Sequence, residues 1–265
     1  MISIVCVFND PSVLNDYLLG SLEKQTADHE LIVLDNTGGG FASAAQALNS
    51  GARRAKGRYI LFAHQDVRLC SPDWLEAAET ALERIPNVGI AGVAGMSENG
   101  RNNKERRRNV ILEHENPVTR WGNPITRPEV VQTVDECLAI VPKHVFDAHQ
   151  FDEKTCNDWH HFTVDFSLTV KSQGLGVIVL PLLIHHRSLG FSRTLVLSLG
   201  SIREIRRYYR SVGKILTKHK SQFEWIYTTN GDYATSKNPI YQDLKRLPSI
   251  VASQSSLGRE SQSVH

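Results

Sequence analysis

Cysteine is scarce in this sequence and is nowhere closely paired. The 265 residues contain four cysteines, far apart from one another and with no Cys-x-x-Cys spacing. Zinc-finger spacing is therefore absent, and a chain of this length does not need a disulfide framework to fold. We interpret most of these cysteines as small apolar core residues.

Long apolar runs are also lacking. No stretch approaches the roughly 20 apolar residues that span a bilayer. Ile2 already begins a short apolar run, and no basic segment precedes it. We therefore expect no signal peptide and predict a cytoplasmic protein, with peripheral contact at the inner face of the membrane left open.

Neither an excess of one charge nor a dinucleotide fingerprint is present. The 30 basic and 28 acidic residues leave a net charge of only +2, so overall charge indicates no partner. No extended nucleic-acid motif occurs, and we expect no nucleic-acid partner. The turn at residues 9–12 lacks the Gly-x-Gly-x-x-Gly that lets backbone approach a pyrophosphate, which argues against a dinucleotide-dependent oxidoreductase.

The first third of the chain alternates short apolar runs with amphipathic segments. This order predicts an α/β layer with a largely parallel sheet. Further on, the pattern predicts strands over 133–141 and 177–180, a short helix from 143 and a helix over 158–170. The early strands are expected at 2–8, 30–34, 58–63 and 88–93, and the early helices at 13–25, 41–55 and 72–85.

A polar triplet, His64-Gln65-Asp66, directly follows the apolar run 59–63. Parallel sheets carry their chemistry beyond the carboxyl ends of the strands, so these side chains stand where a ligand or metal would be met. The alternative is a polar turn in which Asp66 accepts backbone N–H bonds. The triplet alone does not decide between the two.

Two irregular segments of the middle region also have two interpretations each. Residues 97–109 are rich in arginine, which fits either a solvated surface loop or a lid whose arginines meet phosphate. Trp121 stands in a proline-rich stretch and is either a core plug or a stacking platform.

The C-terminal region differs in kind. Apolar residues recur at steps of three and four over 194–220, and nine basic residues but one acidic residue fall between 187 and 220. A basic amphipathic helix of this sort suggests contact with an anionic membrane surface. The alternative is a packing or dimerisation helix with a solvated basic face. We expect residues 253–265, rich in Ser and Gln, to be disordered.

Taken in order, these features resemble a family 2 glycosyltransferase of the GT-A fold, from residue 2 to about 188. The matching pieces are Phe8-Asn9, the strand ending at Asp35, Asn49-Ser50-Gly51, the run leading to Asp66, Phe151-Asp152-Glu153, Asp165 and His186. The resemblance implies a GT-A domain over 1–190 with a mostly parallel central sheet flanked by helices. It would be followed by a basic helical extension over 191–252 and a disordered tail over 253–265.

The resemblance implies a nucleotide-diphosphate sugar as donor and a glycan or lipid-linked acceptor, with an inverting mechanism. A divalent cation, Mn²⁺ or Mg²⁺, would be held by Asp66 and His186. Trp121 and Asp135 would approach the acceptor or the sugar. The residues expected to bind the nucleotide are Phe8, Asn9, Asp35, Asn36, Gly51 and Gln65.

Two departures from the family pattern affect the chemistry. The usual Asp-x-Asp is replaced by His64-Gln65-Asp66, a variant associated with one branch of the superfamily. The later motif keeps only its second acid, because Thr163 stands where the family's base usually falls. Asp165 is therefore the expected catalytic base, with Asp158 and His160 as alternatives. A non-catalytic nucleotide or nucleotide-sugar binding module of the same fold is the competing function, and a homodimer is left open.

Overall fold

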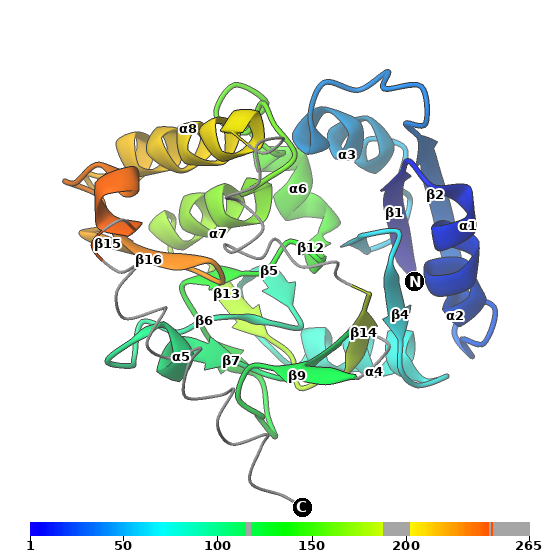
Figure 1. Cartoon of the computed structure of the whole chain (residues 1–265). Helices are drawn as coiled ribbons and strands as arrows, with labels where there is room; N and C mark the ends of the chain where they lie inside the picture. The colour runs from blue at the N-terminus through cyan, green and yellow to red at the C-terminus, as the bar shows by residue number, and fades with distance from the viewer. Residues whose placement is uncertain (115–117, 188–201, 244, 246–265) are drawn as a thin grey trace, which may run out of the picture.

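A computed structural model describes residues 1–114, 118–187, 202–243 and 245 of the chain. Its centre is a seven-stranded sheet with smaller sheets beside it (Figure 1). The central strands, in spatial order, are β10 (Glu129–Val130), β13 (Gly176–Val179), β5 (Val88–Gly92), β12 (Leu138–Pro142), β3 (Tyr59–Ala63), β1 (Ile2–Phe8) and β2 (His29–Asp35).

Most of the central sheet runs in one direction. The pairings of β1 with β2 and β3, and of β13 with β5, are parallel. β12 lies antiparallel between β3 and β5, which therefore share a direction, and β10 is antiparallel at the edge. The predicted strand over 133–141 is two strands, because polar residues at 135 and 136 interrupt it. Its first part is β11 (Thr133–Val134), which pairs outside the central sheet.

Helices cover both faces of the sheet. Alternate residues of each strand point to opposite faces, so β1 buries Ile4 and Cys6 against one helical layer and Val5 against the other. The first layer contains α1 (Pro11–Leu14), the π-helix η1 (Asn15–Leu19), α2 (Gly20–Leu22) and α4 (Trp74–Glu83). The second contains α3 (Ala44–Ala52), α6 (Lys143–His149) and α7 (Phe162–Ser172).

Helix boundaries differ most from prediction where local polar contacts intervene. The first helical segment begins at Pro11 because the Asp10 carboxylate caps it, accepting from the backbone N–H of Ser12 and Val13 at 3.0 and 3.1 Å. The helix expected over 158–170 begins only at Phe162. His161 has a left-handed backbone with φ of 67°, which cannot continue a right-handed helix.

Short strands build the outer walls. One small sheet pairs β4 (Val67–Leu69), β14 (Ile184–His186), β8 (Ile111–Glu113) and β9 (Thr119–Trp121), in that order. A second pairs β11, β6 (Gly95–Met96) and β7 (Arg107–Arg108), and α5 (Asn103–Arg106) precedes β7. The antiparallel register of β14 and β4 sets His186 opposite Val67, directly after the polar triplet.

The C-terminal extension is packed onto the body of the protein. α8 (Ile202–His219) lies beside α7, and a hairpin of β15 (Trp225–Thr228) and β16 (Gly231–Ala234) follows (Figure 1). Val212 and Leu216 of α8 share a buried apolar cluster with Val164 and Leu168 of α7. The apolar face of this amphipathic helix is therefore covered by its own chain.

Over the described part of the helix, this burial agrees with the alternative of a packing helix, and contact with an anionic membrane surface stays a prediction. Several of its basic residues pair within the protein, including Arg207 with Asp158 and Lys218 with Asp152. Residues 194–201 and the predicted disordered tail lie outside the described residues. Among the described helices, none combines the length and apolarity needed to cross a bilayer.

Candidate functional site

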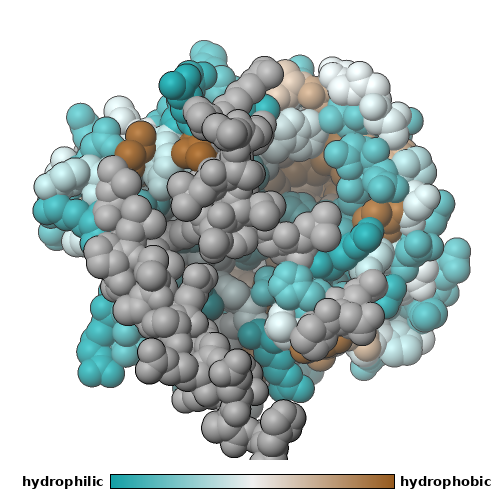
Figure 2. Space-filling model, in the orientation of Figure 1, coloured by the Kyte–Doolittle hydropathy of each residue, from teal (hydrophilic) through white to brown (hydrophobic). Residues whose placement is uncertain are grey.

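The carboxyl ends of β1, β2 and β3 surround a large cavity. Its volume is about 650 Å³, within the range typical of small-molecule sites. Polar groups stand at the strand ends, and Ala44, Leu48, Phe62 and Phe162 form an apolar wall. Figure 2 shows this face of the molecule hollowed, with apolar residues at the bottom of the hollow. The predicted nucleotide residues that line the cavity are Phe8, Asn9, Asn36 and Gln65.

The Gln65 side chain ties two of these strand ends together. Its Oε1 accepts the backbone N–H of Asn9 and of Asp10, both at 3.0 Å, and its Nε2 donates to Oδ1 of Asn9 at 2.7 Å. At the end of β2, the backbone N–H of Asn36 donates to the carbonyl of Phe8 at 2.8 Å, which joins β2 to β1. The cavity rim is thereby held by hydrogen bonds rather than left as loose loops.

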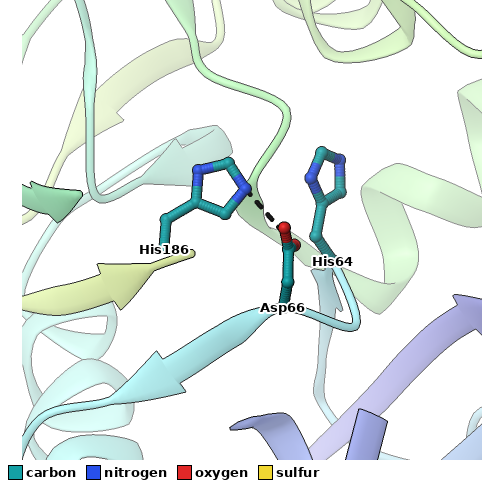
Figure 3. A group of neighbouring side chains, drawn as sticks. All are labelled: His64, Asp66 and His186. Carbon is teal, nitrogen blue, oxygen red and sulfur yellow. Dashed lines mark ion pairs between the residues drawn. The ribbon is translucent and has the colours of Figure 1, made fainter. Parts of the chain in front are cut away.

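Three possible metal ligands meet at the edge of this cavity. His64, Asp66 and His186 offer ligand atoms that all lie within 4.8 Å of one another. In Figure 3 the imidazole of His186 points toward the Asp66 carboxylate, and His64 lies on the other side of it. The distance from Nε2 of His186 to Oδ1 of Asp66 is 3.3 Å.

Backbone contacts fix this trio. The N–H of His64 donates to the carbonyl of Cys137 at 3.0 Å, and the N–H of Arg187 donates to the carbonyl of Asp66 at 3.0 Å. The predicted pair of Asp66 and His186 is brought together, and His64 joins it. His185 instead sits 2.7 Å from the carbonyl of His114 and stacks near Tyr17, apart from the trio.

The electrostatics of the trio keep the Asp66 carboxylate ionised and the His64 imidazole neutral. Burial opposes charge on both Asp66 and His186, but their hydrogen bond and mutual attraction outweigh it. The pKa of Asp66 is therefore lowered and that of His186 is raised. Burial, with the nearby His186, lowers the pKa of His64, so that imidazole is neutral and able to donate a lone pair. Two imidazoles and one carboxylate are a donor set that suits Mn²⁺ better than Mg²⁺.

A second cavity of about 190 Å³ adjoins the first, and His64 and Glu136 line both. Trp121 and Asp135, which we predicted near the acceptor or sugar, line this second cavity, and Arg107 lies 4.8 Å over the Trp121 ring. The C-terminal extension supplies part of the wall, through Tyr208, Thr228, Thr229 and Asn230. The extension is thus part of the site.

Sequence reasoning missed Glu136, which stands where the two cavities meet. Its Oε1 lies 3.3 Å from Nδ1 of His160, and its Oε2 accepts the N–H of His161 at 2.6 Å. The signal was available in principle, because Glu136 and Asp135 form a charged pair just before a buried strand. Nothing local in the sequence, however, connects this pair to residues 160 and 161.

Asp165 does not line either of these two cavities. Its side chain is 2% exposed, and its two oxygens lie 2.7 Å from Nζ of Lys218 and 2.8 Å from Nε2 of His219. Because both partners belong to α8, the carboxylate joins α7 to α8. This environment corrects our assignment of Asp165 as the base. Thr163, at the family's usual acid position, is buried and donates to the carbonyl of Val134.

Gly51 and Asp35, the other two predicted nucleotide-binding residues, are not among the residues that line the larger cavity. Gly51 is packed between α3 and the sheet, where a Cβ atom would lie 2.6 Å from Val5 and 3.0 Å from Leu34. It therefore serves helix packing and does not line the cavity. Asp35 is exposed beside the cavity, and its carboxylate accepts the N–H of Thr37, which lowers its pKa.

The arginine-rich segment 97–109 is folded onto the protein. Arg106 pairs with Asp232 at 3.4 Å and Arg108 with Glu129 at 2.9 Å, so these two arginines have carboxylate partners outside the segment. Asn103 donates to Asp232 and to the carbonyl of Thr228. The segment therefore fastens the C-terminal hairpin to the body.

Sequence comparison gives one family and one curated relative. The profile described as "Glycosyltransferase like family" matches residues 3–195, well over half of the chain. A protein of Fuscovulum blasticum named "ATP synthase subunits region ORF 6" is 28% identical over 195 residues, which cover 69% of this chain and 74% of that protein.

Solved structures with similar folds are glycosyltransferases. Mannosyltransferase PcManGT from Pyrobaculum calidifontis, with GDP-Man and Mn²⁺, has a TM-score of 0.53 at 11% identity over 84% of this chain and 64% of its own. TarS 1-349 of S. aureus, with UDP-GlcNAc, has a TM-score of 0.54 at 13% identity, and the match covers 82% of this chain and 66% of TarS 1-349. GalNAc-T7, with UDP, GalNAc and Mn²⁺, has a TM-score of 0.52 at 14% identity, and the match covers 71% of this chain and 44% of that structure.

The chain thus spans less than two thirds of each of these structures. At such identities the likeness shows the fold alone. It confirms the predicted GT-A type α/β fold, and the profile match extends over nearly all of the domain that carries the two cavities. The chain belongs to the glycosyltransferase-like family.

Proposed function

We propose that this protein transfers a hexosyl or related sugar from a nucleotide-diphosphate sugar to a glycan or lipid-linked acceptor, with inversion and with a divalent cation. One observation carries the proposal. Two adjoining cavities share His64 and Glu136, and a three-ligand set lies at their boundary. A transferase needs this arrangement, with donor and acceptor on either side of the reacting carbon.

The larger cavity is the proposed donor site. Its volume of about 650 Å³ suits a small-molecule ligand, and its rim presents the amides of Asn9, Asn36 and Gln65 beside the Phe8 backbone. The relatives solved with GDP-Man, UDP or UDP-GlcNAc support a nucleotide ligand, although they do not identify which one binds here.

His64, Asp66 and His186 are the proposed ligands of Mn²⁺ or another divalent cation. When bound, the cation would offset the negative charge of the leaving diphosphate. The donor set and the lowered pKa of Asp66, which keeps its carboxylate ionised, support this assignment.

The smaller cavity is the proposed acceptor site. Trp121 can stack on the apolar face of a sugar, and Asp135 can accept a hydroxyl hydrogen bond. We propose that the acceptor is a growing polysaccharide in the cytoplasm. Any membrane contact would use exposed basic residues of α8 such as Arg206 and Arg210, since its apolar face is covered.

The test is calorimetric titration with UDP, GDP, dTDP and CDP, each with and without Mn²⁺. We expect one nucleotide to bind tightly only with Mn²⁺, and Asp66→Ala to abolish that dependence. Asp73→Ala is the control, because this exposed carboxylate makes no capping hydrogen bond at α4. If no nucleotide bound under any condition, the donor-site proposal would fail.

A non-catalytic binding module is the second candidate. Thr163 favours it, because it replaces the usual acid and cannot accept a proton. Nucleotide-sugar binding with neither transfer nor donor hydrolysis, across a broad acceptor panel, would support this alternative.

A further inference from the structure

We propose that His160, oriented by Glu136, is the general base that removes the proton of the acceptor hydroxyl. The inference rests on the proposed transferase function. It assigns the role of base to a residue that lines the smaller cavity, which Asp165 does not. His160 and Glu136 come from separate segments, yet they meet where the two cavities join. An acceptor in the smaller cavity would reach a donor sugar at this junction.

The contact has the geometry of an oriented base. Nδ1 of His160 lies 3.3 Å from Oε1 of Glu136, and the two side chains are 32% and 22% exposed. The imidazole is therefore accessible from the cavity while its carboxylate partner lies deeper. A base held by a third group is the arrangement that enzymes use to aim an imidazole at a hydroxyl.

The charge state of Glu136 selects the useful tautomer of His160. Burial would raise the pKa of Glu136, but the hydrogen bond from His160 and the electrostatic attraction of the neighbouring imidazoles of His160, His161 and His64 lower it to about 2. An ionised carboxylate accepts hydrogen bonds only, so Nδ1 of His160 carries the proton and Nε2 carries the lone pair. Nε2 is then the basic atom.

The backbone around His160 is held in place from several sides. Arg207 binds Asp158 through two contacts of 2.8 Å, and Ser211 donates to the carbonyl of His160 at 3.4 Å. His161 has a left-handed backbone, a strained conformation that clusters at functional sites. Its N–H donates to Glu136, so the same carboxylate stabilises this conformation and orients the imidazole.

Other acids near the site are less suited. Asp158 is bound by Arg207, and Asp66 belongs to the proposed cation ligands. Asp135 accepts the N–H of Cys137 at 2.9 Å but also lines the cavity. Glu113 lines it as well, and burial raises its pKa. Glu113 and Asp135 are therefore the competitors that the experiment must separate from His160.

The proposed sugar transfer is a single displacement at the anomeric carbon. The acceptor oxygen forms a bond to the anomeric carbon while the bond from that carbon to the diphosphate oxygen breaks. The electron pair of the broken bond leaves with the diphosphate. The acceptor proton passes to Nε2 of His160, giving an imidazolium beside the Glu136 carboxylate, and later leaves to water.

The experiment uses the full chain and water as the acceptor. Nucleotide release from UDP-GlcNAc, GDP-mannose and related sugars is measured with Mn²⁺ for the wild type, His160→Ala, His160→Gln and Glu136→Gln. We expect both His160 variants to lose turnover by about 10²–10⁴-fold while nucleotide affinity stays within twofold. Added imidazole should restore His160→Ala and leave Glu113→Gln and Asp135→Asn unchanged.

His149→Ala, a half-buried histidine of α6 that lines neither cavity, is the control for histidine loss and for imidazole competing at the cation site. Wild-type turnover by the His160 variants, or a loss that imidazole does not restore, would overturn the assignment while the donor site stands. Absence of nucleotide binding in the wild type would overturn the proposed function and this inference together. Donor binding without wild-type turnover, either on water or on any member of a broad acceptor panel, would overturn the base and favour the binding module.

Discussion

Replacing Asp165 with alanine should destabilise the protein and spare its nucleotide site. The carboxylate is 2% exposed on α7 and contacts Lys218 at 2.7 Å and His219 at 2.8 Å, both in the last turn of α8. His219 is itself 3% exposed. Without Asp165, the imidazole of His219 would remain buried and lose this partner.

The magnitude follows from burial. Removing one member of a buried ionic group costs about 3–5 kcal/mol, because the remaining polar groups stay desolvated. The lower end applies, since Lys218 is 31% exposed and keeps Asp152 at 3.0 Å. We therefore expect a loss of about 3 kcal/mol in the free energy of unfolding, or about 6–12 °C in Tm. Asp165→Asn keeps one hydrogen bond to His219 and should lose about half as much.

Urea and thermal unfolding measure the stability, and nucleotide titration below the transition measures the site. The matched control is Asp147→Ala on α6, where the carboxylate is 53% exposed and pairs with Lys143 four residues earlier. That change should cost less than about 0.5 kcal/mol. An Asp165→Ala protein that unfolded like the wild type but had lost turnover would refute this reasoning and return Asp165 to the chemistry.

Three further predictions follow from the packing and the titrating groups. Gly51→Ala should cost about 1–3 kcal/mol in unfolding, because its Cβ would meet Val5, while nucleotide affinity stays unchanged; lost affinity at full stability would contradict this. Mn²⁺ affinity, titrated between about pH 5 and 8, should fall with falling pH earlier than for an ordinary histidine, because the raised pKa of His186 favours its protonated form, which cannot bind metal. The stabilising effect of ionised Glu136 should be fully present above its ordinary pKa of 4.5 and be lost as the pH falls through about 2, so unfolding of Glu136→Gln should lack that component of the acid dependence.

Much of the fold could be predicted from local patterns. The β1 strand was expected over 2–8 and is Ile2–Phe8, and β2, β3 and β5 lie within two residues of their predicted ends. The errors came where a polar contact overrides the apolar pattern. Asp135 and Glu136 divide one predicted strand, and the left-handed backbone of His161 delays α7 by four residues.

The candidate site was predictable only where function follows a strand end. Asn9, Asn36 and Gln65, which the family resemblance implied as nucleotide-binding residues, lie at the ends of neighbouring strands and line the larger cavity, where nucleotide binding stays a prediction. Gly51 was misassigned because a motif match does not tell a glycine that faces a ligand from one that packs a helix onto a sheet. Asp165 was misassigned because its α8 partners lie far away in the chain.

The sequence by itself determined the order of strands and helices, the apolar layers on each side of the sheet, and the polar triplet at the end of β3. These are local properties, set by side-chain periodicity over a few residues. Only the tertiary structure decided that Glu136 meets His160 and that α8 covers α7 with its apolar face. Each of these contacts depends on how separate segments pack against one another, and no local pattern specifies that packing.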